Sequence, residues 1–446
     1  MTQTVSHSAS ITPANVHAVL GRHILADGLP MIMDMSRSQG AYLYDAKRDR
    51  RLLDLFGCFS TCTIGYNHPG LDSPEFRERL LPVALNKPSN SDLYTTEMAD
   101  FVEAFARTVP APLAEKMFFI EGGAPAVENA LKTAMDWKVR KNLAAGRGEL
   151  GQQIIHFREA FHGRSGYTMS LTNTDPLKTQ YFAQFDWPRI TNPKLRFPVT
   201  EEVLAEVIAA EERAVAEIRQ ALVDNRHDIA GLIIEPIQGE GGDSHFRPEF
   251  LRTLRTLADE NEFLLIFDEV QTGFGTTGAW WCFEHFEVLP DIFAFGKKTQ
   301  VCGICAGPRL NEVESVFHVS SRINSTWGGN LVDMVRCQRF IEIIEEDRLV
   351  ENAARVGAEL LASLEELEQR FPERVSNARG RGFFVAFDLP SPETRQQTIR
   401  AMLESGVLGL PSGRRSIRFR PPLSLTSAEA SDGMDKLAAA LATVLG

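Results

Sequence analysis

Two carboxylates, Asp268 and Glu269, stand directly after the five apolar residues 263–267. An unbroken apolar run rich in Phe and Ile is typical of a strand that is buried on both faces of a parallel sheet. In open α/β sheets, ligands bind just beyond the carboxyl ends of the strands. Asp268 therefore stands where a side chain can face a ligand, although the same two acids could also open a solvated turn.

Two other segments place chemically active residues after apolar runs. Lys297 follows residues 292–295 and a glycine, and Gly123 follows the short apolar run 116–120. Pro125 suits the first turn of a helix that we expect to begin at this glycine turn. Free N–H groups at a helix N-terminus can bind a phosphate, but a βα turn without a ligand has the same pattern. The segment is neither a Walker loop nor GxGxxG, so it does not indicate a nucleotide.

A carboxylate, a lysine and a phosphate cradle that meet in one cavity would fit pyridoxal 5′-phosphate. The aldehyde of this cofactor forms a Schiff base with a lysine, its pyridine nitrogen needs an acidic partner, and its phosphate needs N–H donors. A carboxylate beside the pyridine nitrogen keeps that nitrogen protonated, so the ring can accept electrons from the substrate. The spacing of Gly123, Asp268 and Lys297 does not prove that they converge, and the cofactor is a hypothesis at this point.

Apolar strands alternate with amphipathic helices between residues 115 and 300. This alternation predicts an α/β fold with a mostly parallel central sheet and helices on both faces. Later in the chain, two long helical patterns precede short strands, and the capping box Thr426-x-x-Glu429 opens a last helix. We expect an N-terminal segment at 1–66 that contributes to the small domain, a large cofactor-binding domain at 67–330 and a small α+β domain at 331–446.

The composition narrows the classes of partner. A net charge of −12 and a pI near 5.4 disfavour nucleic acid and anionic membranes, which attract clustered Lys and Arg. No apolar run approaches the roughly 20 residues that span a bilayer, and residues 1–14 lack a signal-peptide pattern, so we expect a cytoplasmic protein. Six cysteines in 446 residues do not form a disulfide framework. Cys302 and Cys305 lack the second ligand pair of a zinc site, and we interpret them as small buried thiols.

Four blocks, taken in order, carry a resemblance to a known family. The chain resembles the class III pyridoxal-phosphate aminotransferases of fold type I over nearly its whole length. The segments at 87–92, 161–167 and 296–303 are most similar to the branch that acts on the ε-amino group of lysine. The four blocks are Glu235-Pro236-Ile237-Gln238-Gly239-Glu240-Gly241-Gly242, Phe267-Asp268-Glu269-Val270-Gln271-Thr272-Gly273, Phe295-Gly296-Lys297 and Ser325-Thr326-Trp327-Gly328-Gly329-Asn330.

The resemblance implies a role for each residue around the cofactor ring. Lys297 is expected to form the Schiff base and then to move the proton between substrate and cofactor. Its neighbour Lys298 is expected to be structural. Asp268 is expected to pair with the pyridine nitrogen and Gln271 with the phenolic oxygen, while Phe161 stacks on the ring.

The resemblance also implies how the phosphate is held. The backbone of Gly123 and Ala124 is expected to bind it, and Thr326 is expected to reach it from the other subunit of a homodimer. This chain departs from many relatives in two places, because Ala124 replaces the usual hydroxyl residue and Pro125 replaces an acid. A side-chain contact to the phosphate is therefore lost there, but the backbone N–H groups remain.

For the substrates, the resemblance implies two carboxylate sites and a switch. Arg418 is expected to bind the α-carboxylate of 2-oxoglutarate and Arg164 a more distant carboxylate. L-lysine presents methylenes where 2-oxoglutarate presents a carboxylate, and an unpaired buried Arg beside methylenes is costly. We expect Glu240 to pair with Arg418 for lysine and to leave it for 2-oxoglutarate.

The expected reaction transfers the ε-amino group of L-lysine to 2-oxoglutarate and yields 2-aminoadipate 6-semialdehyde and L-glutamate. Ornithine, 4-aminobutyrate or another ω-amine is the alternative donor. A catalytically silent protein that binds the cofactor is an alternative of another class.

Overall fold

A seven-stranded sheet forms the centre of the computed structural model, which describes residues 10–446. The strand order is β3-β9-β8-β7-β6-β4-β5; β9 is antiparallel to both of its neighbours, and the other pairs are parallel. The predicted mostly parallel α/β sheet is thus confirmed. The strands are β3 (Lys116–Ile120), β4 (Gln153–Phe157), β5 (Arg189–Ile190), β6 (Ile229–Ile234), β7 (Leu264–Asp268), β8 (Ile292–Phe295) and β9 (Cys302–Ala306).

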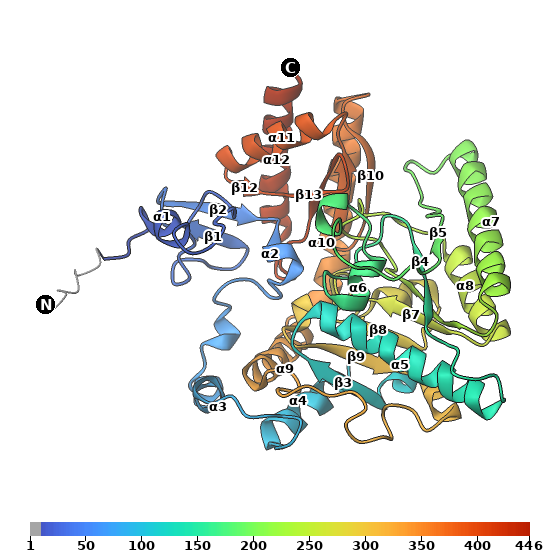
Figure 1. The fold of residues 1–446 in the computed structure, drawn as a ribbon. Coiled ribbons are helices and arrows are strands. Elements are labelled where there is room, and N and C mark those ends of the chain that lie inside the picture. The colour runs from blue at the N-terminus through green and yellow to red at the C-terminus, as the bar shows by residue number, and fades with distance from the viewer. Residues whose placement is uncertain (1–9) are drawn as a thin grey trace, which may run out of the picture.

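Helices cover both faces of this sheet. Figure 1 shows α5 beside the sheet, and α8 packs into the hydrophobic cluster on the opposite face. Along β7, Leu264 and Ile266 pack into the cluster that includes α5, whereas Leu265 and Phe267 pack into the larger cluster on the other face. Successive side chains of a strand point to opposite faces, so a fully apolar strand requires two cores. The helices of this part are α4 (Thr96–Ala106), α5 (Gly123–Ala144), α6 (Gly166–Leu171), α7 (Glu201–Asp224), α8 (Pro248–Glu260) and α9 (Leu331–Glu346).

A second, antiparallel sheet of four strands lies in the C-terminal part, in the order β10-β11-β14-β13. A third sheet joins the two ends of the chain, because β12 pairs in parallel with β2, which pairs with β1. The capping box at Thr426 is present and opens the last helix. The elements are β1 (Tyr42–Asp45), β2 (Arg50–Asp54), α10 (Leu349–Arg370), β10 (Ser376–Arg381), β11 (Phe384–Asp388), α11 (Pro392–Glu404), β12 (Val407–Leu408), β13 (Leu410–Ser412), β14 (Ser416–Phe419) and α12 (Ser427–Leu445).

Short helices make up the rest of the regular structure, and none of the helices at 10–446 has the length and apolar character needed to cross a membrane. Of the polar start at 1–14, the first nine residues lie outside the described residues. The short helices are α1 (Val16–Leu20), α2 (Gly57–Ser60) and α3 (Pro74–Leu85), with 3₁₀ turns η1 (Pro69–Leu71), η2 (Ala111–Leu113), η3 (Pro176–Lys178), η4 (Cys282–Phe286), η5 (Lys297–Thr299) and η6 (Pro308–Glu312).

The one antiparallel strand inside the central sheet, β9, contains Cys302 and Cys305. Both thiols are buried, as the sequence predicted. Between them, Gly303 lies opposite Phe119 on β3 and Phe295 on β8. A Cβ at Gly303 would lie 2.1 Å from the carbonyl oxygen of Phe118, so only glycine permits this close approach. The strand therefore locks β8, which leads to Lys297, against β3, which leads to the glycine turn.

We expect Gly303→Ala to destabilise the protein, because the new methyl group meets backbone atoms that cannot move independently. Overpacking of this kind costs about 1–3 kcal/mol, which lowers the midpoint of thermal unfolding by several degrees. Gly28→Ala is the matched control, since no atom lies within 4 Å of the Cβ it adds. Equal midpoints for the two variants, measured by calorimetry, would contradict the packing described for β9.

Candidate active site

Asp268 is the last residue of β7 and is buried, with 5% of its surface exposed. Its Oδ2 lies 2.8 Å from Nδ1 of His162, and its Oδ1 accepts a hydrogen bond of 3.0 Å from the N–H of Val270. These two contacts fix the plane of the carboxylate and leave each oxygen a further lone pair. The other ring nitrogen of His162, Nε2, is buried and has no partner within residues 10–446. The carboxylate is held in place and can still accept a hydrogen bond from a protonated ligand.

Lys297 begins a 3₁₀ turn directly after β8 and Gly296, with a left-handed φ of +55°. Its Nζ makes no hydrogen bond or ion pair with the part of the chain described here, although Asp268 and Glu235 both act on it electrostatically. Desolvation, aided by the Arg418 guanidinium, lowers the pKa of Lys297 to about 8 against those two acids. A larger share of this amine is therefore neutral, and nucleophilic, than for an ordinary lysine.

The neighbouring Lys298 has a different environment. Its Nζ donates to the carbonyl oxygens of Cys62 at 2.9 Å and Pro421 at 3.3 Å. The hydroxyl of Thr63 donates to the backbone carbonyl of Lys298. The side chain is buried and ties the N-terminal segment and the C-terminal part to the turn that carries Lys297. This is the structural role that the sequence suggested for Lys298.

The glycine turn before α5 forms an anion cradle. Gly122 has a φ of +102°, and α5 starts at Gly123 without a side-chain cap. The N–H groups of Gly123 and Ala124 lie at the N-terminus of a 22-residue helix, where the helix dipole favours negative charge. Gly163 packs beside the cradle, where an added Cβ would lie 2.6 Å from the Cβ of Ala124. The cradle is thus lined by backbone and a methyl group, as the sequence implied.

Gln271 follows Asp268 by three residues and faces two arginines. Its Oε1 accepts hydrogen bonds from Arg418 at 2.9 Å and from Arg420 at 3.2 and 3.3 Å. These donors fix which end of the amide is oxygen, so the NH₂ group points elsewhere and is free to donate. Such a donor suits the phenolic oxygen of the cofactor.

Arg418, on β14, is 3% exposed, and its Nε is buried without a partner within the described chain. Asp243 lies 3.8 Å away but pairs more closely with Arg420, at 2.7 Å, and both members of that second pair are fully buried. Burial lowers the pKa of Arg418 against the pull of Asp243 and Glu235. One acid thus serves two buried guanidinium groups, which leaves Arg418 able to bind a further carboxylate.

Glu240 does not contact Arg418 in this structure. Its carboxylate pairs with Lys178 and accepts a hydrogen bond of 2.9 Å from Thr174 Oγ1. Arg164 is exposed and lies near enough to lower the pKa of Lys178, after burial the largest cause. The carboxylate that the resemblance pairs with Arg418 therefore has other partners in this structure.

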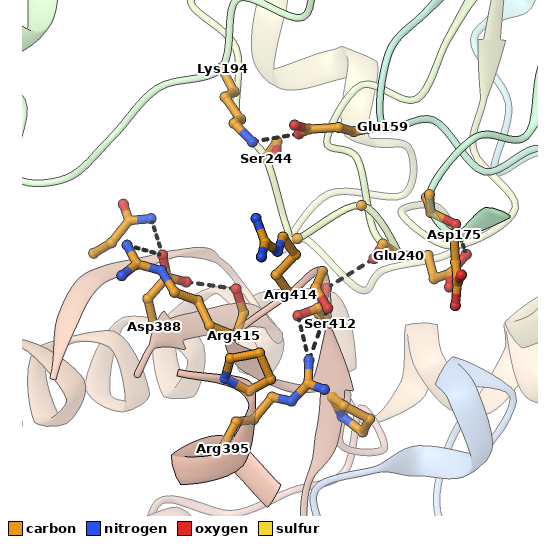
Figure 2. Close-up of a pocket in the computed structure, with 18 of the residues that line it drawn as sticks. Glu159, Asp175, Lys194, Glu240, Ser244, Asp388, Arg395, Ser412, Arg414 and Arg415 are labelled. Carbon is orange, nitrogen blue, oxygen red and sulfur yellow. Dashed lines mark hydrogen bonds and ion pairs between the residues drawn. The ribbon is translucent and has the colours of Figure 1, made fainter. Parts of the chain in front are cut away.

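A cavity of about 1000 Å³ opens beside Glu240, between the 240–244 loop and the strands β13 and β14 (Figure 2). Lys178 and Thr174 line it together with Glu240, whereas Lys297 and Asp268 do not. The cavity therefore does not contain Lys297. Figure 2 also shows the Lys194–Glu159 pair across the cavity from Glu240.

Phe161 and Thr326 complete the set of expected residues. Phe161 is half-buried, its N–H donates to Glu235 at 3.0 Å, and the ammonium of Lys178 lies 5.7 Å from its ring centroid. Thr326 is exposed, on a loop whose backbone oxygens accept hydrogen bonds from Ser89 and Asn90. Its contact with a partner subunit's phosphate stays a prediction.

The chain's own residues fit pyridoxal 5′-phosphate. Within residues 10–446, Lys297 has a lowered pKa and no partner for its amine, Asp268 is a buried carboxylate with spare lone pairs, and α5 begins at an uncapped glycine turn. These are the three groups this cofactor needs. Sequence reasoning missed several supporting residues. The missed residues are His162, Asp243, Lys178 and Thr174, which carry no local signal that links them to Asp268, Arg418 or Glu240.

Comparison with known proteins agrees with this fit. Residues 24–441 match the family model for aminotransferase class-III. The L-lysine-epsilon aminotransferase of Mycobacterium tuberculosis is 52% identical over 436 residues, which are 97% of this chain and 96% of that protein. The enzyme of the same name from Streptomyces clavuligerus is 46% identical over 433 residues, with 96% and 94% covered. The structure of lysine aminotransferase from M. tuberculosis in the internal aldimine form superposes with a TM-score of 0.95 at 51% identity, covering 97% of this chain and 100% of that one.

Fold and site together define a pyridoxal-phosphate enzyme of fold type I. The chain belongs to the aminotransferase class-III family, and it is a transaminase that depends on pyridoxal 5′-phosphate. The expected family, enzyme class and cofactor are confirmed.

The pKa of Lys297 can be tested without any substrate. In the cofactor-free protein, labelling of Lys297 by an amine-reactive reagent should rise with pH around a midpoint near 8, since only the neutral amine reacts. Arg418→Met should move the midpoint upward because it removes a nearby positive charge, and Arg418→Lys, which keeps the charge, should not. Peptide mass spectrometry reads out the labelling, and a midpoint at the ordinary lysine value of about 10.4 would contradict the desolvated environment.

Proposed function

We propose that this protein is an L-lysine 6-aminotransferase that passes the ε-amino group of L-lysine to 2-oxoglutarate. The observation that carries this proposal is the identity of 46–52% over nearly the whole chain with proteins named L-lysine-epsilon aminotransferase. The geometry supports it, because a buried Arg418 and a Glu240 that pairs with Lys178 instead of Arg418 suit a pocket that takes two unlike substrates. The products are 2-aminoadipate 6-semialdehyde and L-glutamate.

When bound, pyridoxal 5′-phosphate supplies an aldehyde that captures the amine and a ring that withdraws electrons from the reacting carbon. Around it, Asp268, which is oriented by His162, would hold a proton at the pyridine nitrogen. Lys297 would hold the cofactor, and its amine, once free, would carry a proton at Nζ between the substrate carbon and the cofactor. Gln271 would donate its amide N–H to the phenolic oxygen, and Phe161 would lie against the ring.

The phosphate is held by the N–H groups of Gly123 and Ala124 at the start of α5. We further propose that Thr326 reaches this phosphate from the partner subunit of a homodimer. The exposed positions of Thr326 and its neighbour Trp327 support a role outside their own subunit. The cytoplasmic location and the division at residues 66 and 330 are also parts of the proposal.

The two substrates make opposite demands beside Arg418. The α-carboxylate of 2-oxoglutarate pairs with the guanidinium, while the methylenes of lysine cannot. With lysine bound, Glu240 turns to Arg418 and supplies the missing negative charge. Arg164 binds the carboxylate at the far end of either substrate, which keeps the reacting end of each at Lys297.

A half-reaction panel tests the donor. We expect the cofactor-bound enzyme to lose its visible absorbance band on addition of L-lysine and to regain it with 2-oxoglutarate. Addition of ornithine or 4-aminobutyrate at the same concentration should leave the band unchanged. If the band is lost with ornithine or 4-aminobutyrate but not with lysine, that amine is the donor instead of lysine. A catalytically silent protein would keep the band with all three amines.

The switch predicts unequal effects of a single substitution. Glu240→Gln should lower kcat/KM of the lysine half-reaction by about 10- to 100-fold, because Arg418 then faces methylenes unpaired. The 2-oxoglutarate half-reaction should change by less than about threefold, since Glu240 is away from Arg418 in that step. Glu159→Gln, in the same cavity, is the control. Equal losses in the two half-reactions would contradict a Glu240 that pairs with Arg418 only when lysine is bound.

A further inference from the structure

Lys178 and Thr174 hold the carboxylate of Glu240 away from Arg418. Both residues come from one segment that precedes and includes the turn η3, and both bind the same carboxylate. We propose that Lys178 is a positioning residue, the second anchor of Glu240, which keeps Arg418 free for the carboxylate of 2-oxoglutarate. This inference rests on the proposed function, because it assigns a partner to the state in which Glu240 has left Arg418.

The position of Lys178 is fixed by its own segment. Asp175 accepts a hydrogen bond of 3.0 Å from the N–H of Leu177 and so caps the turn that ends at Lys178. The ammonium also lies 3.4 Å from Thr174 Oγ1 and 5.7 Å from the ring centroid of Phe161. The ammonium thus contacts Thr174, Phe161 and Glu240, and its position can stay fixed while the carboxylate moves.

A second cation, Arg418, lies near the backbone that carries Glu240, because Gln271 Oε1, which accepts a hydrogen bond from Arg418, would lie 2.3 Å from a Cβ at Gly239. The pKa of Lys178 is lowered, first by burial and then by the positive charges of Arg164 and Arg418, which places Arg418 near this anchor. The three cations repel one another, and a carboxylate among them relieves that repulsion at whichever cation it joins. The side chain of Lys178 is 17% exposed and that of Arg418 is 3% exposed. Water can solvate Lys178 when Glu240 leaves, but it cannot solvate Arg418.

This difference in exposure decides how the two anchors act. When lysine occupies the pocket, Arg418 has no carboxylate from the substrate, and its need for Glu240 exceeds that of the solvated Lys178. When 2-oxoglutarate arrives, its carboxylate satisfies Arg418, and Lys178 with Thr174 receives the displaced Glu240. Without the second anchor, Glu240 would remain on Arg418 and compete with the acceptor.

A competing role for Lys178 is direct binding of the substrate's distal carboxylate, together with Arg164. That role predicts weaker binding of both substrates, because each carries a distal carboxylate. The anchor role predicts weaker binding of 2-oxoglutarate alone. The two half-reactions therefore separate the roles.

The first experiment compares both half-reactions of the cofactor-bound enzyme in Lys178→Met. We expect KM for 2-oxoglutarate to rise about tenfold with little change in kcat, and the lysine half-reaction to change by less than about twofold. Lys178→Arg should restore KM because it keeps the charge. Lys194→Met is the control, since Lys194 lines the same cavity but pairs with Glu159 (Figure 2). No change in KM for 2-oxoglutarate, or equal losses for both substrates, would overturn the inference.

The second experiment places Lys178→Met in the Glu240→Gln background. If Lys178 acts through Glu240, it should add no further change to KM for 2-oxoglutarate, so the two effects are not additive. A full additional tenfold rise would show a direct contact with substrate and would overturn the anchor role. Equal thermal midpoints of Lys178→Met, Lys178→Arg and the parent protein confirm that folding is intact, and Lys178→Gln, which also removes the charge, takes the place of Lys178→Met if that variant unfolds.

The outcome for the parent enzyme separates this inference from the proposed function. If the parent enzyme does not react with lysine, the proposed function fails whatever Lys178 does. If the parent enzyme reacts and Glu240→Gln is selective, but Lys178→Met leaves KM for 2-oxoglutarate unchanged, only the second anchor is lost.

Discussion

The buried guanidinium of Arg418 is the constraint on which the rest of the site depends. A cation that is 3% exposed needs an anion or several acceptors, because water cannot reach it. Gln271 supplies one acceptor, while Asp243 is shared with Arg420, so the balance of charge around Arg418 is incomplete. Under the proposed function, that incompleteness lets a substrate carboxylate bind at Arg418, and it requires a replacement whenever the substrate has no carboxylate there.

The fold brings the necessary groups to this guanidinium from separate sheets. β7 and β8 end at Asp268 and next to Lys297 on the same edge of the central sheet, whereas Arg418 lies on β14 of the C-terminal sheet. Lys298 links these parts, since its amine binds carbonyls from residues 62 and 421. Lys298 therefore holds the turn that carries Lys297 against the C-terminal part of the chain that carries Arg418.

Local sequence patterns predicted the strands and the residues at their ends. Residues 263–267 are apolar at every position because β7 is buried on both faces, and Asp268 follows at the carboxyl end of the strand. Gly122 and Gly123 likewise predicted that a helix begins at this glycine turn. The resemblance to a family then assigned roles that no spacing could assign, such as that of Gln271.

The unpredicted features are contacts between distant segments. His162 meets Asp268 across 106 residues, and Lys178 meets Glu240 across 62, with no periodic pattern to announce either pair. The sequence predicted the buried thiols of β9 but not the strand itself, because Cys302-Gly303-Ile304-Cys305 is short and its glycine weakens a strand prediction. Its place between β3 and β8 depends on the close backbone approach at Gly303, which is a property of the packed sheet.

The central claim is that methylenes of one substrate and a carboxylate of the other occupy the same place beside Arg418. Lysine labelled with ¹⁵N at either nitrogen tests it most directly, with the label in the glutamate product followed by mass spectrometry. The account predicts transfer of the ε-nitrogen and retention of the α-nitrogen in the oxidised product. Transfer of the α-nitrogen would place the carboxylate of lysine at Arg418 and would contradict the account.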